Sequence, residues 1–352
     1  MTSKQYFALV VALVVSLVGS FTLFNLAQDD FGLFWSRQDK RIWTLEKTTK
    51  YLMSYRYIPE NFEGLLIGPS YSDGFVNTKQ LEGYRVYNLS MEGGNATELR
   101  AAAVNAMERG HMRFIVICLS SYLTKDHGMK GPQINAKEYW GSLFSWLPIE
   151  ILRAKWDAHR RPGADRYVGT EWGASQPLSH HIAIPWDDYI QMQLNDPLLP
   201  EVDPVAYEDL KAIVATAHAR GVKVLAFFYP YDHWRIRQAV ANGMWERYQT
   251  DMRALFDPRT DVVVDMTTPD YMAMRFDVAC YTDEHLSAAG AQRMLAELQR
   301  LLDAHIRGIH RAPTLNTVAR VCAPSREASG FDRAPDQLAT ELRSLTAGRA
   351  GG

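Results

Sequence analysis

Short apolar runs alternate with longer amphipathic segments from residue 61 to about residue 308, and this alternation admits few architectures. The apolar runs end at turns and have the length of buried strands; they lie at 64–68, 84–89, 113–119, 222–228 and 261–265. The amphipathic segments have helical periodicity and lie at about 96–109, 204–220, 234–256 and 287–305. Strands that alternate with helices form a mostly parallel sheet with helices on both faces. The sequence therefore predicts an α/β fold, specifically a three-layer α/β/α sandwich.

An uncharged stretch of 22 residues, from Tyr6 to Ala27, precedes this domain. As a helix it would span roughly 30 Å, the thickness of a bilayer core. Lys4 precedes the stretch and Asp29 and Asp30 follow it, which places the N-terminus in the cytoplasm and the rest of the chain outside. A cleaved signal peptide is the alternative, but the stretch is long for one and "FNLAQ" is a poor cleavage site. We expect an uncleaved single-pass anchor.

The remaining organisation follows from changes in composition. We expect an anchor at 1–28, a connector at 29–60, the α/β domain at 61–308 with an insertion at about 121–200, and a tail at 309–352. The tail is rich in Ala, Arg, Pro, Ser and Gly and predicts little order. The insertion is rich in Trp, Pro, Gly and His, and is either a lid or partner surface or a surface excursion with its own small core.

Several function classes are excluded by composition and motif. The net charge is only −2, whereas a nucleic-acid binder has a clustered basic surface. His159, His180, His181 and His233 have no spacing typical of metal ligands, and "GPSYSDG" lacks the lysine of a phosphate-binding loop. We predict no metal, no cofactor and no nucleic-acid partner.

The three cysteines form no zinc-like cluster. Cys118 lies inside the apolar run "FIVICL" and is most simply a buried thiol. Cys280 and Cys322 would be able to pair in an oxidising compartment, and the sequence leaves open whether they meet.

Two turns at the ends of predicted strands contain candidate functional groups. Ser70 directly follows the first apolar run, between Gly68 and Gly74, where a tight turn would present its hydroxyl. In an open parallel sheet, ligands bind at this carboxyl edge. Gly94 follows the second run, and Asn95 is placed to cap the next helix, so that backbone N–H groups there would hold an oxyanion. Taken alone, a Gly-Pro-Ser turn is more often structural than catalytic.

A third block, "CYTDEHLSAAG", lies just before the last predicted helix. A nucleophilic serine needs a base within hydrogen-bond reach and a group that orients the base. His285 would take the proton from Ser70, and Asp283 would orient the imidazole. Alternatively, Asp283 and Ser287 are helix caps and His285 is a surface residue.

Aromatic residues gather where the fourth run ends, in "FFYPYDHW". Tyr231, His233 and Trp234, with Tyr229, would lie at the same edge of the sheet as Ser70. These rings would line a sugar-binding site; equally, the segment is an aromatic-rich hinge that covers the core.

Taken together, "GPSYSDG", "GGNATEL" and "DEH" resemble the SGNH, or GDSL-like, hydrolase superfamily over roughly residues 60 to 305, with the insertion set aside. The resemblance implies that Ser70 is the nucleophile, His285 the base and Asp283 its orienting partner, with Gly94 and Asn95 at the oxyanion hole. The family's Gly-x-Asn block should fall at "CLSSYLT", which contains no asparagine, so Ser120, Ser121, Asn95 or another amide would have to substitute.

The spacing of the acid and the base departs from the commoner Asp-x-x-His, a position that Thr282 occupies here. The shorter Asp-x-His is similar to that of the membrane-associated alginate O-acetyltransferases, a branch of the superfamily. These proteins, like the teichoic-acid D-alanyl transfer proteins, combine an extracytoplasmic SGNH-like domain with a membrane anchor or export signal.

The resemblance implies a membrane-anchored serine acyltransferase in the inner (cytoplasmic) membrane, with its domain in the periplasm or outside the cell. It would receive an acyl group, such as acetyl, from a multi-span membrane protein and pass it to an exported polysaccharide or cell-wall glycan. Two alternatives stay open. One is a carbohydrate or lipid esterase that uses the same triad, and the other is a non-catalytic component of a polysaccharide modification complex, which the missing asparagine favours.

Overall fold

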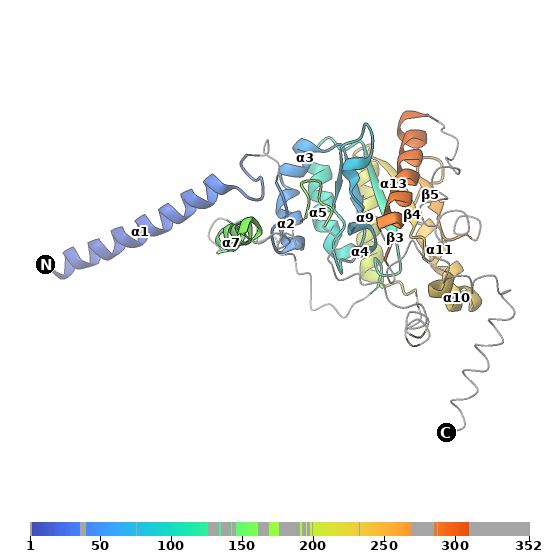
Figure 1. Ribbon diagram of the computed structural model, residues 1–352, viewed down its shortest axis with the longest axis horizontal. Coiled ribbons are helices and arrows are strands. Elements are labelled where there is room, and N and C mark those ends of the chain that lie inside the picture. Colours follow the sequence, from blue (N-terminus) through green and yellow to red (C-terminus); the bar gives the residue numbers. More distant parts are fainter. Residues whose placement is uncertain are drawn as a thin grey trace, which may run out of the picture.

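The computed structural model shows an α/β domain and one long N-terminal helix that extends away from it (Figure 1). It describes residues 2–35, 40–74, 76–125, 134, 142, 146–160, 169–175, 191, 195, 198, 200–231, 233–268, 285–286 and 288–309. Cys280, Cys322 and nearly all of the predicted tail lie outside these residues, as does most of the predicted insertion.

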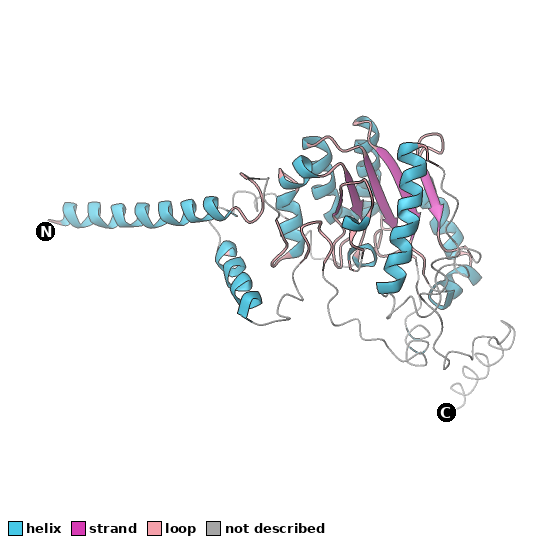
Figure 2. Cartoon of the chain, turned by 45° about the horizontal axis from the view of Figure 1, so that its top comes forward, coloured by secondary structure: helices cyan, strands magenta, loops and turns pink. Residues whose placement is uncertain are grey.

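Five parallel strands form one sheet in the order β2-β1-β3-β4-β5 (Figure 2). The strands are β1 (Gly64–Ile67), β2 (Val86–Asn88), β3 (Phe114–Leu119), β4 (Lys223–Phe228) and β5 (Val262–Asp265). β1 and β3 are buried along their whole length, which explains their unbroken apolar sequence, because both sides of a central parallel strand face protein. The predicted α/β class and the five predicted strands are confirmed.

The strand order places a topological switch point between β1 and β3. From β1 the chain crosses to β2 at one edge and then returns to β3 on the other side of β1. Ile67, the last residue of β1, pairs with Ile117 of β3, so the two strands end close together. In doubly wound sheets the loops separate at such a point and leave room for a ligand.

Helices connect the strands, and their buried faces are rich in small and aliphatic side chains. They are α2 (Glu46–Met53), α3 (Tyr57–Asn61), α4 (Ser70–Asp73), α5 (Ala96–Arg109), α7 (Leu147–Arg160), α9 (Pro204–Ala219), α10 (His233–Ala241), α11 (Met244–Arg253) and α13 (Ala288–Leu302), with short turns η1 (Thr78–Gln80) and η4 (Asp303–Arg307). α5 packs against α9, and these two helices contact β1 and β4, respectively. Ala102, Ala103 and Ala106 are fully buried on α5, so small side chains allow the two helices to approach closely.

The single helix predicted at 234–256 is wrong, since the structure has two helices there, α10 and α11. Gly243 lies between them with φ 72°, in the left-handed region that interrupts a helix at little cost only for glycine. The Asn242 side chain accepts a hydrogen bond from the Met244 N–H at 3.0 Å and helps to start α11.

The predicted N-terminal helix is present as α1 (Ser3–Gln28), which points away from the domain (Figure 1). Thr2 and Gln5 close its first turn with a reciprocal pair of hydrogen bonds. Its most apolar stretch is not buried by any other part of the protein, and the helix is long and apolar enough to cross a membrane.

Part of the stretch expected to be a connector belongs to the domain. α2 and α3 bury Leu52, Met53 and Ile58 completely in the same core as the sheet. The chain therefore enters the folded domain soon after α1 ends.

The core around β4 yields a first test. Phe227 is fully buried in the central sheet, and Phe227→Ala should lower the free energy of unfolding by about 3–5 kcal/mol, because it leaves a cavity. Val205→Ala, at a 63% exposed position of α9, is the control and should change it by less than about 0.5 kcal/mol. Denaturant unfolding of the detergent-solubilised full chain measures both, and equal losses would contradict the packing described here.

Candidate active site

Ser70 is the first residue of α4, the short helix that begins three residues after β1 ends. The turn between them requires glycine at position 68 because the backbone passes very close to its neighbours. A Cβ atom at Gly68 would lie 2.2 Å from the Ser72 Oγ and 2.7 Å from the Cys118 Cβ. Because position 68 has no side chain, α4 packs directly against β3, and Ser70 therefore lies at the carboxyl edge of the sheet.

Side chains from β2 and from the segment after it hold α4 in place. The fully buried Asn88 donates hydrogen bonds from its Nδ2 to three carbonyl oxygens, those of Ser72, Asp73 and Val76, at 2.8, 3.2 and 3.1 Å. The Ser72 and Ser90 hydroxyls lie 2.8 Å apart. A four-residue helix has little stability of its own, so these contacts decide where Ser70 lies.

A buried ion pair fixes the other end of α4. The Lys50 Nζ, on α2, contacts the Asp73 Oδ1 at 2.8 Å and the Glu46 Oε1 at 2.6 Å, and it also donates to the Ser90 carbonyl. The Ser175 hydroxyl donates to the other oxygen of Asp73. The Lys50 side chain is completely buried, and all three of its donors have acceptors, as a buried ammonium requires.

Burial and the nearby Glu46 carboxylate raise the pKa of Asp73 to about 7, against the opposing effect of Lys50. Burial alone would lower the pKa of Lys50, but the two carboxylates outweigh it and the net shift is upward. The ammonium of Lys50 thus stays charged at neutral pH, while the raised pKa of Asp73 lets this carboxyl take up a proton more readily than an exposed aspartate does.

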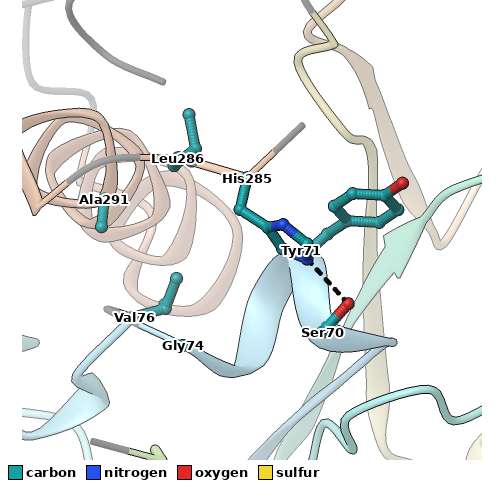
Figure 3. A pocket seen from close by; sticks show the side chains of 7 residues that line it. All are labelled: Ser70, Tyr71, Gly74, Val76, His285, Leu286 and Ala291. Carbon is teal, nitrogen blue, oxygen red and sulfur yellow. Dashed lines mark hydrogen bonds between the residues drawn. The ribbon is translucent and has the colours of Figure 1, made fainter. Parts of the chain in front are cut away.

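The structure brings Ser70 and His285 together, although they lie 215 residues apart in the sequence (Figure 3). The His285 Nε2 is 2.9 Å from the Ser70 Oγ, a hydrogen-bond distance. Both side chains are half-buried. His285 lies three residues before α13 begins, and the buried face of α13 joins the core of the sheet. The pair has the geometry of a hydroxyl nucleophile beside a general base.

An aromatic stack supports the imidazole. The ring of Tyr71, the residue after Ser70, lies 5.0 Å from the His285 ring at an interplanar angle of 34°. On its other side Tyr71 packs against Tyr229 at 4.6 Å, and Tyr231 meets it edge-on at 5.3 Å. These rings hold Tyr71, and Tyr71 limits the orientations that His285 can adopt.

A pocket opens beside the pair (Figure 3). Its lining residues are Ser70, Tyr71, Gly74, Val76, His285, Leu286 and Ala291. Apart from its chain neighbours, no described residue has an atom within 4 Å of the place where a Cβ atom of Gly74 would be, so this glycine leaves space at the wall. Apart from the hydroxyls and the imidazole, the side chains of the pocket are apolar, which suits a small acyl group better than an ion.

The predicted oxyanion residues lie in the turn after β2, which is tied to the turn after β1 by a hydrogen bond from the Met91 N–H to the Gly68 carbonyl at 3.0 Å. The Gly94 N–H already donates to the Met91 carbonyl at 2.9 Å. The Asn95 side chain caps α5 by accepting from the Glu98 N–H at 3.2 Å. In this conformation both residues serve the turn and the helix, and a role at an oxyanion hole stays a prediction.

The predicted sugar-binding residues are only partly described. Tyr231 is 1% exposed and packs among aromatic rings, so it supports Tyr71 and offers no free ring face to a sugar in this conformation. His233 and Trp234 begin α10, and the orientations of their side chains lie outside the described residues. Ser121 lies at the end of β3 with its hydroxyl 3.4 Å from that of Tyr231.

Asp283, the predicted partner of His285, lies outside the described residues. Sequence reasoning missed Lys50, Asp73, Asn88 and Tyr71, which hold the turn that contains Ser70 and the imidazole of His285. Asp73 and Tyr71 lie in the "SYSD" of that turn, so a search for partners of the turn would have found two of them. Lys50 and Asn88 lie outside this turn, so the same search would not have found them. In addition, a lysine on a short helix is usually exposed.

The close approach at Gly68 leads to a second test. Gly68→Ala should lower the free energy of unfolding by about 1–3 kcal/mol, since the added methyl group must displace α4 or β3. Gly19→Ala is the control, because apart from the backbone of α1 itself no described residue has an atom within 4 Å of a Cβ atom at this position. Denaturant unfolding in detergent measures both variants. A Gly68→Ala protein as stable as the wild type would contradict the tight turn.

The raised pKa of Asp73 leads to a third test. Its ordinary value is 3.8, so between about pH 4 and pH 7 the folded protein holds a proton that the unfolded chain has released. Stability must then fall as pH rises through this range. Asp73→Asn should remove this contribution and flatten the decrease, whereas Asp251→Asn, at an exposed position of α11, should not. Denaturant unfolding at several pH values measures the slope, and an unchanged slope in Asp73→Asn would contradict the assignment.

No protein-family model, no curated protein and no solved structure matches this chain. The function is therefore inferred from the chemistry of the site alone. Its central feature is a serine hydroxyl and an imidazole in hydrogen-bond contact, at the switch point of a parallel sheet and beside an apolar pocket.

Proposed function

We propose that this protein is a membrane-anchored serine acyltransferase, whose domain is a three-layer α/β/α sandwich of the SGNH-like kind. The observation that carries the proposal is the 2.9 Å contact between the Ser70 Oγ and the His285 Nε2. Serine is a weak nucleophile at neutral pH, and a neighbouring imidazole is the usual means of activating it.

In the proposed reaction, the Ser70 Oγ attacks the carbonyl carbon of the donor's acyl group while His285 takes the hydroxyl proton at Nε2. The tetrahedral intermediate collapses, the bond to the leaving group breaks, and His285 returns the proton to that group. The acyl-serine is then attacked by a sugar hydroxyl, whose proton passes to His285 and back to Ser70 as the ester is released. Asp283 is proposed to hold the imidazole through Nδ1.

The intermediate needs donors for its oxyanion. The Ser70 N–H, at the first position of α4, donates to no acceptor within the described part of the chain. It is the donor that we propose first. The Gly94 N–H is the second, and it would have to leave the Met91 carbonyl, for example when the acyl donor binds.

The long helix α1 supports transfer over hydrolysis. An anchor keeps the site near the membrane and raises its effective concentration where a membrane-bound donor delivers the acyl group. We propose that a multi-span membrane protein is this donor, that the anchor lies in the inner (cytoplasmic) membrane with the domain in the periplasm or outside the cell, and that the acceptor is an exported polysaccharide or cell-wall glycan.

The activated serine is tested with a fluorophosphonate that reacts with nucleophilic serines. Intact mass of the wild-type full chain should increase by one adduct, while Ser70→Ala should not react and His285→Ala should react at least about a hundredfold more slowly, as expected for loss of a general base. Ser16→Ala is the control, since Ser16 is an exposed serine of α1 that makes no contact described at the site, and this variant should react like the wild type.

A folded wild type that stays unlabelled would overturn the proposed nucleophile and favour the non-catalytic alternative. An adduct that persists in Ser70→Ala would assign the reactivity to another serine. With labelling established, an acyl-nitrophenyl ester offered with and without an oligosaccharide separates the remaining functions. Acylated sugar indicates a transferase, and release of free acid alone indicates an esterase.

A further inference from the structure

Helix α7, from the predicted insertion, exposes large apolar side chains that the site does not use. Leu152 is 45% exposed and Trp156 is 56% exposed, and Trp146, just before the helix, is 69% exposed. Leu152 and Trp156 are four residues apart, so they lie on the same face of the helix. Ile151, about 100° around the helix from Leu152, is buried in the core of the domain. The helix is thus amphipathic, with one apolar face covered and another one open.

Contacts place α7 at the domain-side end of α1. The Trp146 ring lies 5.6 Å from the ring of Phe21, and Lys155 forms an ion pair with Asp30, two residues beyond the end of α1. Phe21 lies seven residues before Gln28, or roughly 10 Å along the helix axis. Trp146 is therefore level with the last two turns of α1, and Lys155 is level with the point where the chain leaves this helix.

The direction of α7 fits a helix that lies in the plane of a membrane. It runs across the axis of α1 and does not continue it (Figure 2). If α1 crosses a bilayer, α7 lies along the bilayer surface at the depth where tryptophan is enriched. Interfacial helices of this kind bury their apolar face about 5–10 Å into the boundary between headgroups and acyl chains.

We propose that α7 is an interfacial membrane helix that inserts the side chains of Trp146, Leu152 and Trp156 among the lipids. Arg153 and Arg160 remain at the headgroup level, and Arg160 already covers the Trp156 ring at 4.1 Å. α7 has three Lys or Arg side chains against two acidic ones, so its attraction to anionic lipid is weak and apolar insertion dominates. The proposal rests on the membrane anchor of the proposed function, but not on its chemistry.

This second contact would fix the domain relative to the bilayer. A single helix leaves the attached domain free to swing, whereas two contacts at different points define its orientation. The site around Ser70 would then face a membrane-bound donor at a constant height and angle.

Spin labels on the full chain test the proposal in vesicles of phosphatidylcholine with a minority of phosphatidylglycerol. In the protein to be labelled, Cys280 and Cys322 are replaced by serine. Cys118 is retained because it is buried. Each label is attached to a single introduced cysteine. The three variants are Leu152→Cys on α7, Val14→Cys on α1 and Glu208→Cys at an exposed position of α9. At Leu152 and Val14, collisions with oxygen should exceed those with a water-soluble nickel chelate several-fold. At Glu208 the order should be reversed.

The proposal would be overturned if the label at Leu152 were as accessible to the chelate as the label at Glu208 while the label at Val14 lies in lipid. Protection of Leu152 from both reagents would also overturn it, because a protein surface would then cover this face. A label at Val14 that is exposed to water would show that α1 does not cross the membrane, and it would overturn the proposal as well. Fluorophosphonate labelling of Ser70 in the same vesicles shows independently whether the proposed nucleophile is correct.

Quenching of tryptophan fluorescence provides a second measurement that retains all native cysteines. Lipids brominated along their acyl chains should quench the wild type more than Trp146→Phe/Trp156→Phe, and this difference should persist in vesicles of phosphatidylcholine alone. Equal quenching of the two proteins would contradict insertion. A difference confined to anionic vesicles would contradict the apolar mode of binding.

Discussion

The buried ion pair between Lys50 and Asp73 is the contact on which the candidate site depends most. It joins α2 to the short helix α4, and α4 carries Ser70. Removing one partner of a buried pair typically costs about 3–5 kcal/mol, because the other charge is left without compensation. A pair of apolar residues would satisfy the core equally well, but it would not define a single orientation of α4 as hydrogen bonds do.

The pair of Ser70 and His285 is assembled across the sheet. Ser70 follows β1, His285 precedes α13, and Tyr229 at the end of β4 supports both through the ring of Tyr71. The turn after β1, which leads to Ser70, is joined to the turn after β2 by the hydrogen bond from Met91 to Gly68. Because these groups come from different strands, a small shift of any one strand would change the Ser–His distance, and the rigid core of the parallel sheet prevents this.

The proposed anchor is close in sequence to the residues that support the site. α1 ends at Gln28, and α2, which contains Lys50, begins at Glu46. Asp29 accepts hydrogen bonds from the N–H groups of Leu33, Phe34 and Trp35, so the chain turns sharply as it leaves α1. Seventeen residues separate α1 from α2, so the proposed anchor lies close in sequence to the helix that carries Lys50.

The sequence by itself determined most of the secondary structure and the place of Ser70 directly after a strand. Helix α5 has the predicted bounds, because Asn95 caps its start and Gly110 follows its end, both of which are local effects. The break at Gly243 was missed, since apolar periodicity continues across it and a single glycine is a weak local signal. The approach of His285 to Ser70 was predicted from the resemblance of short motifs, and not from any pattern linking the two positions.

Only the tertiary structure decided which groups surround the serine. The pairing of Lys50 with Asp73, the three hydrogen bonds of Asn88 and the stacking of Tyr71 on His285 join residues that are distant in sequence. Likewise, the Gly94 N–H is engaged because of the backbone conformation of its turn, which the residue type does not specify. Local propensities act over a few residues and set the elements, whereas contacts across the sheet depend on how those elements pack.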